Sequence, residues 1–144
     1  MAKRFKDLTE REILALAISL EEEDARIYGD FADGLRADFP ATAKIFEEME
    51  TEESEHRASL FALYQKRFGD HIPLIRRDDV SGFVRRRPVW LTRPLGIKAV
   101  RRQAELMEME TRQFYLKAIQ KVTDASTRKL LGDLVPGGAV QRTN

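Results

Sequence analysis

Residues 46–56 read Phe46-Glu-Glu-Met-Glu-Thr-Glu-Glu53-Ser-Glu-His56, a helix-favouring run that ends in two metal-ligand residue types. Glu53 and His56 are three residues apart, so on a helix their side chains lie on one face and can hold one metal region. Alone, this motif is a weak signal, because Glu-x-x-His also arises by chance on the solvated face of a Glu-rich helix. Its meaning therefore depends on the helices around it.

Two long helices are expected in the first half of the chain. Thr9 and Glu12 form a capping-box pattern, which predicts the start of the first helix. The Phe39-Pro40 pair breaks that helix, and proline suits the first turn of a second helix that we expect to run to about Phe68. Gly69 is then a natural C-terminal cap for the second helix.

The second half begins with a long connection and then returns to helical patterns. Residues 70–96 are rich in proline and arginine, so we expect a crossover with at most a short helix between Asp78 and Arg86. A third long helix is expected from about Gly96 to Val122. A fourth starts near Asp124, a good cap residue.

These elements predict an all-α fold, a ferritin-like four-helix bundle with one long crossover. The fourth helix is truncated or altered after Leu134, because Pro136-Gly137-Gly138 cannot readily continue it. We therefore expect a helical domain over residues 1–134 and a tail of different character over residues 135–144.

The composition of the 144-residue chain is that of a soluble helical protein, with 42% hydrophobic and 34% charged residues. The absence of cysteine excludes disulfides, iron–sulfur clusters, rubredoxin-type iron sites and thiol catalysis. No apolar run reaches the roughly 20 residues of a membrane span, and a cytoplasmic location is predicted. The net charge of +1 gives no global attraction for nucleic acid, so we expect no nucleic-acid partner.

The arginines from Arg76 to Arg102 leave a further possibility open, a patch for nucleic acid or phospholipid headgroups. They are interrupted by prolines and acidic residues, which favours a solvated loop or salt bridges to the Glu-rich helices over such a patch.

Glu21 strengthens the metal interpretation because it lies on the apolar stripe of the first helix, between Ala17 and Tyr28. A carboxylate among core positions is costly unless it is paired, protonated or metal-bound. Glu22 is the fallback ligand, and Glu21 could also sit at the edge of the stripe and reach water.

An internal repeat adds a second carboxylate. Residues 20–28 resemble residues 107–115, which indicates two similar helices, each with a glutamate followed by a tyrosine seven residues later. These tyrosines could donate hydrogen bonds to metal ligands, although plain core tyrosines are equally compatible with the pattern. The alignment pairs Glu21 with Glu108 and Tyr28 with Tyr115.

Di-iron bundles use one Glu from each of two helices and a Glu-x-x-His from each of the other two. Carboxylates can bridge two metal ions, and imidazole completes a site suited to iron. The candidate metal ligands are Glu21, Glu53, His56 and Glu108, and no catalytic residue is expected beyond them.

The Phe46–His56 run and the two glutamate segments resemble the rubrerythrin branch of the ferritin-like superfamily. The segment Phe68-Gly-Asp-His-Ile-Pro-Leu-Ile-Arg-Arg-Asp-Asp, followed by Arg87-Pro-Val-Trp-Leu, is similar to the N-terminal domain of bacterial membrane-bound ferritins. In that family a rubrerythrin-like domain precedes a vacuolar-iron-transporter-like membrane domain. The resemblance covers residues 1 to about 134.

The resemblance implies a di-iron site that oxidises ferrous iron with dioxygen or hydrogen peroxide, with roles in iron efflux, iron homeostasis and peroxide resistance. It also implies a homodimer. Full-length family members are anchored in the inner membrane through the membrane domain, so this chain would be their cytosolic part.

The chain departs from the family pattern where a second Glu-x-x-His is expected, since those positions hold Gly138 and Gln141. Three outcomes are open: one bound metal, two weakly bound metals, or a metal-free bundle whose acidic centre is partly protonated or hydrated. The alternative function is a catalytically inactive helical module for dimerisation or docking. Glu105 could substitute as a ligand, whereas His71 in the crossover is expected to be structural or exposed.

Overall fold

The structure is a computed structural model that describes residues 3–86, 88–92 and 96–136, with Trp90 described by its backbone alone. It confirms an all-α chain: the described residues form four bundle helices and no sheet. These helices are α1 (Glu10–Leu35), α2 (Pro40–Phe68), α4 (Ile97–Lys121) and α5 (Ala125–Asp133). Three shorter elements complete the order, η1 (Phe5–Asp7), η2 (Arg77–Asp79) and α3 (Val89–Thr92).

The helix boundaries follow from local chemistry that the sequence makes visible. The Thr9 side chain accepts a hydrogen bond from the Glu12 backbone N–H, and the Glu12 carboxylate accepts one from the Thr9 N–H, which completes the predicted capping box. Pro40 opens α2 as expected. Asp124 caps α5 by accepting a hydrogen bond from the Thr127 N–H at 2.9 Å.

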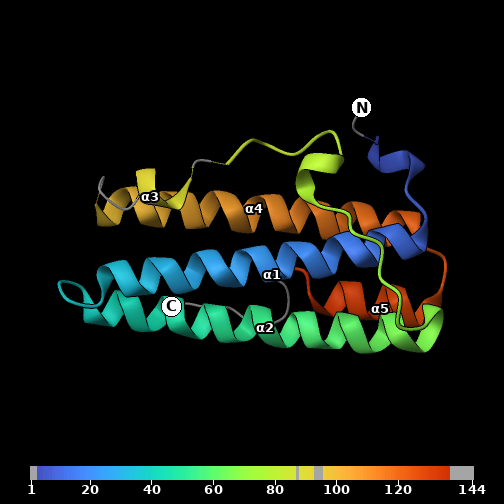
Figure 1. The fold of residues 1–144 in the computed structure, drawn as a ribbon, viewed down its shortest axis with the longest axis horizontal. Helices are drawn as coiled ribbons and strands as arrows, with labels where there is room; N and C mark the ends of the chain where they lie inside the picture. The colour runs from blue at the N-terminus through green and yellow to red at the C-terminus, as the bar shows by residue number, and fades with distance from the viewer. Residues whose placement is uncertain (1–2, 87, 93–95, 137–144) are drawn as a thin grey trace.

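The four helices form a bundle in which α5 is much shorter than the others. In Figure 1, α1 lies between α2 and α4, while α5 runs alongside only one half of the bundle. The end of α5 at Asp133, with Leu134 as its cap residue, confirms the prediction that the fourth helix stops early. Among the described residues, α5 therefore covers only one half of the bundle.

The crossover runs from the end of α2 across α1 to the α4 side of the bundle (Figure 1). The prediction of a short helix between Asp78 and Arg86 is wrong. A 3-10 turn ends at Asp79, and the chain is then non-helical up to Arg86. The reason is that backbone groups of this segment bond to Lys3, which donates to the Asp79 carbonyl and accepts from the Ser81 N–H. A helix would forfeit both bonds.

Two apolar clusters fill the bundle, one at each end, and a layer of buried polar residues lies between them. The polar residues of this layer are Glu21 and Asp24 on α1, Glu53 on α2 and Thr111 on α4. They occupy positions that helical periodicity assigns to the core. The flanking apolar residues are Leu20 and Tyr28 on α1, Met49 and Leu60 on α2, and Met107 and Phe114 on α4.

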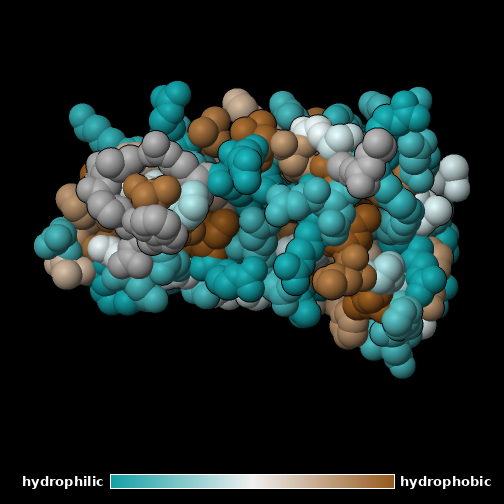
Figure 2. Space-filling view, turned by 45° about the horizontal axis from the view of Figure 1, so that its top comes forward, coloured by the Kyte–Doolittle hydropathy of each residue, from teal (hydrophilic) through white to brown (hydrophobic). Residues whose placement is uncertain are grey.

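The face of the molecule shown in Figure 2 is mostly hydrophilic, with apolar side chains gathered in a few patches. Within the described ranges, no helix has both the length and the apolar character needed to cross a membrane.

Candidate metal centre

The structure brings Glu21, Glu53 and His56 together in the polar layer between the two apolar clusters. Each of the three offers a ligand atom, and these atoms lie within 4.8 Å of one another. Glu21 is 1% exposed and Glu53 is 7% exposed, whereas the His56 side chain is 23% exposed. Part of the imidazole is therefore exposed, although its Nδ1 atom, which faces the two carboxylates, is buried.

The donor atoms approach one another without forming hydrogen bonds. His56 Nδ1 lies 3.3 Å from Glu53 Oε1 and 3.6 Å from Glu21 Oε2, yet neither Nδ1 nor Glu21 Oε1 has a hydrogen-bond partner. Leaving a buried polar atom unpaired costs about 1–3 kcal/mol. Ligands held about 2.1 Å from a tetrahedral or octahedral cation lie roughly 3.0–3.4 Å apart, close to the separations seen here. The arrangement fits a cation better than a set of hydrogen bonds.

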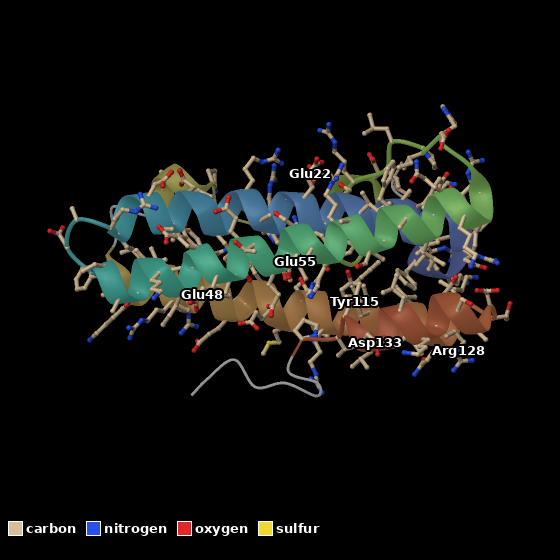
Figure 3. All side chains as sticks on the ribbon, turned by 90° about the horizontal axis from the view of Figure 1, so that it is seen from below. Glu22, Glu48, Glu55, Tyr115, Arg128 and Asp133 are labelled. Carbon is tan, nitrogen blue, oxygen red and sulfur yellow. The ribbon has the colours of Figure 1, made fainter. Side chains whose placement is uncertain are left out.

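Tyr115 fixes the orientation of Glu21 from α4. Its hydroxyl donates a hydrogen bond to Glu21 Oε2, and both side chains are buried. Burial, together with the nearby carboxylates, raises the pKa of Tyr115 well above its usual value, so the phenol stays protonated and remains a donor. Tyr115 is labelled on the α4 ribbon in Figure 3. Tyr28, its counterpart in the repeat, packs against Phe46 with 6.0 Å between ring centroids.

The cluster binds protons strongly when no metal is present. Burial raises the pKa of Glu53 to about 7, although the neighbouring His56 opposes the shift. Burial alone would lower the pKa of His56, but the carboxylates of Glu21 and Glu53 outweigh that effect and raise it to about 10. A metal ion must therefore displace at least one proton, and its binding strengthens as the pH rises.

Glu108, the fourth predicted ligand, is half-buried on α4, and it is not among the residues whose donor atoms converge in the described part of the chain. Glu22 and Glu105 are exposed, and Glu22 lies 3.5 Å from the Arg57 guanidinium. Glu22 and Glu55, both labelled in Figure 3, have solvent-exposed side chains. Of the predicted carboxylates, Glu21 and Glu53 are brought together, and Glu108 is not joined to them.

His71 lies beyond the end of α2, away from the centre. Its side chain is exposed, and its backbone carbonyl accepts hydrogen bonds from the Tyr64 hydroxyl and the Arg11 guanidinium. Gly138 and Gln141, the positions where a second Glu-x-x-His was expected, lie outside the described residues.

The salt bridges expected between the crossover arginines and the Glu-rich helices are formed in the same layer by Arg77 and Arg86 as an ionic network, whereas the burial of this network was not predicted. Arg86 from the crossover donates to Asp24 Oδ1 at 2.7 Å and to Glu110 Oε1 at 2.8 Å. Arg77 donates to Glu110 Oε2 at 2.8 Å, and the Thr111 hydroxyl donates to Asp24 Oδ2 at 3.1 Å. Burial raises the pKa of Asp24 to about 6, against the lowering effect of Arg86. One signal was available, since Asp24 stands one turn after Glu21 on the same stripe.

Comparison with known families agrees with this geometry. A protein-family model described as Rubrerythrin matches residues 12–136, which includes every residue of the cluster and of the ionic network. No curated protein and no solved structure matches the chain significantly. Because the family model spans most of the sequence and the bundle carries the Glu, Glu and His cluster, the chain belongs to the rubrerythrin family.

Proposed function

We propose that this chain binds ferrous iron through Glu21, Glu53 and His56 and that dioxygen or hydrogen peroxide oxidises the bound ion. Such an activity would serve iron homeostasis and peroxide resistance. One observation carries the proposal: three donors converge in a buried layer while Glu21 Oε1 and His56 Nδ1 have no hydrogen-bond partner. The rubrerythrin family, whose members hold iron in such bundles, supports it.

The donor set suits ferrous iron. Carboxylate oxygen and imidazole nitrogen bind ferrous ions well, and the chain has no cysteine to favour a thiophilic metal. Of the three side chains, His56 is the most exposed, so we expect a small oxidant to approach the centre beside its imidazole. Each ferrous ion gives one electron to the oxidant as it becomes ferric.

Three features of the chain's own residues would assist that reaction. Tyr115 holds Glu21 Oε2, which leaves Oε1 directed to a metal. The apolar clusters on either side limit the water around the centre and strengthen electrostatic attraction there. The proton carried by His56 leaves when iron binds.

A second function is favoured by the chain's single Glu-x-x-His and by the position of Glu108 outside the converging group. In that alternative the bundle is an inactive module for dimerisation or docking, and the polar layer stays protonated. The two functions differ in one measurable property, the uptake of iron.

The test is an anaerobic ferrous titration of the whole chain, followed by exposure to air or peroxide and measurement of near-ultraviolet absorbance and metal content. We expect saturable uptake and an oxidant-dependent ferric absorption that Glu53→Gln and His56→Gln remove. Glu55→Gln and His71→Gln are matched controls, because both side chains are exposed and outside the cluster. Absence of uptake, or equal uptake in all four variants, would favour the inactive module.

The likeness to membrane-bound ferritins stays a prediction, because the matching family model is the broader rubrerythrin one. The homodimer is likewise a proposal that follows from the family. Light scattering of the purified chain tests it, and a mass near 16.6 kDa at micromolar concentration would count against the dimer.

A further inference from the structure

We infer that this chain binds one divalent cation, whereas the dinuclear site of the family binds two. The neighbouring carboxylates of Asp24 and Glu110 are neutralised by Arg86 and Arg77 instead of by a second cation. The inference rests on the proposed function, because it concerns the same centre. It changes the chemistry of that centre, since a single ion lacks the adjacent metal partner of the family's dinuclear site.

The number of donors is the first reason. A dinuclear site in such a bundle takes four carboxylates and two imidazoles from the four helices. Within the described residues, only Glu21, Glu53 and His56 form a group of at least three potential ligands whose donor atoms all lie within 4.8 Å of one another. Two carboxylates and one imidazole are half of the ligands of a dinuclear site. They can supply part of the coordination shell of one cation, and water or oxidant would take its remaining positions.

The second imidazole has no source in this chain. The chain contains two histidines, and the other one, His71, follows α2 beyond Tyr64. Tyr64 is eight residues past His56, or about 12 Å along the helix axis. Residues 134–144 contain no histidine, aspartate or glutamate, so this segment supplies no ligand side chain of these types.

The spacing of the donors also fits one ion. The imidazole nitrogen is 3.3 Å from one carboxylate and 3.6 Å from the other, which matches neighbouring corners of one coordination shell. A second ion would sit about 3.5–4 Å from the first and need its own ligands on the far side.

The ionic network makes one position next to the cluster, between α1 and α4, unfavourable for a second ion. Asp24 lies one turn from Glu21 on α1, and Thr111, its partner on α4, lies one turn from Tyr115. The two carboxylates of the ionic network are already paired, Asp24 with Arg86 at 2.7 Å and Glu110 with both Arg86 and Arg77 at 2.8 Å. A second dication there would have to displace a buried guanidinium or lie against it, and either is costly.

The experiment is a titration of the intact chain with Mn²⁺, which does not react with oxygen at neutral pH, by calorimetry and electron paramagnetic resonance. We expect one bound ion per chain and the spectrum of isolated Mn²⁺. Two ions per chain with the magnetic coupling of adjacent ions would overturn the inference while leaving the proposed function intact. Absence of binding would overturn the proposed function and the inference together.

Variants separate the centre from its surroundings. Glu53→Gln should weaken Mn²⁺ binding at least about tenfold, whereas Glu108→Gln should change it less than about threefold, because Glu108 lies outside the converging group. Circular dichroism checks that both variants fold. An equal loss in both variants would show that Glu108 is a ligand and would contradict a one-ion shell made of Glu21, Glu53 and His56.

Discussion

Replacing Arg86 by methionine tests whether the buried ionic network stabilises the polar layer. The arginine side chain is 9% exposed and joins Asp24 and Glu110, while methionine keeps much of its volume and removes the charge. Asp24 would keep only its hydrogen bond from Thr111, and Glu110 would keep Arg77 and the Val84 N–H.

The expected cost follows from the two carboxyl groups that lose Arg86. Because the pKa of Asp24 is about 6, protonating Asp24 at pH 7 costs about 1.4 kcal/mol. Without Arg86 the carboxyl can take up this proton, so the stability lost through Asp24 is at most about 1.4 kcal/mol. The charge-assisted bond to Glu110 adds about 1.5–3 kcal/mol. We therefore expect Arg86→Met to lower the free energy of unfolding by about 3–4 kcal/mol at pH 7.

The pH dependence makes this prediction specific. The folded-state pKa of Asp24 is raised above the unfolded value, so at pH 5 the carboxyl is already protonated in the wild type and no longer needs Arg86. The penalty should then be smaller by about 1.4 kcal/mol, as measured by urea unfolding at both pH values.

Two control variants accompany that measurement. Arg85→Met, at an exposed neighbouring position, should stay within about 0.5 kcal/mol of the wild type. In an Asp24→Asn background, the pH dependence of the Arg86→Met penalty should disappear. A penalty under about 1 kcal/mol at pH 7, or one that is equal at both pH values, would refute the reasoning.

Three further predictions concern the metal centre. Tyr115→Phe should weaken Mn²⁺ binding about tenfold, measured by calorimetry, whereas Tyr64→Phe should not; equal affinities would show that the hydrogen bond to Glu21 is unimportant. In the metal-free chain the folded state holds the His56 proton up to about pH 10, so the free energy of unfolding should fall above pH 6.5, by at most about 1.4 kcal/mol per pH unit. His56→Gln should reduce this pH dependence of the free energy of unfolding in urea titrations. An unchanged pH dependence would contradict the ion pairs of His56 with Glu21 and Glu53. Finally, Mn²⁺ binding should release protons and strengthen from pH 6 to pH 8, seen as a buffer-dependent heat; a heat independent of the buffer would contradict proton displacement.

The fold could be predicted from the sequence because its boundaries depend on local chemistry. The capping box at Thr9, the proline that opens α2 and the Asp124 cap act within one helical turn, so a short window contains all the information. The path of the crossover could not be predicted in the same way. The conformation near Asp79 depends on backbone bonds to Lys3, which is far away in the sequence.

The candidate site was predictable only in part, for a related reason. Glu21 could be identified because a carboxylate on an apolar stripe needs a partner, and Glu53 and His56 because they form a Glu-x-x-His motif. Salt bridges from the crossover arginines to the Glu-rich helices could be expected, but the burial of Arg86 could not, since it depends on how the crossover packs over α1 and α4. The separation of Glu108 from the cluster depends on tertiary packing, which periodicity does not determine.

Anomalous diffraction at the iron absorption edge, from crystals grown anaerobically with ferrous iron, tests the central claim most directly. We predict a single iron peak per chain, bonded to Glu21, Glu53 and His56 Nδ1 at about 2.0–2.2 Å. An anomalous map without iron between these three side chains would contradict the claim that they form a metal centre.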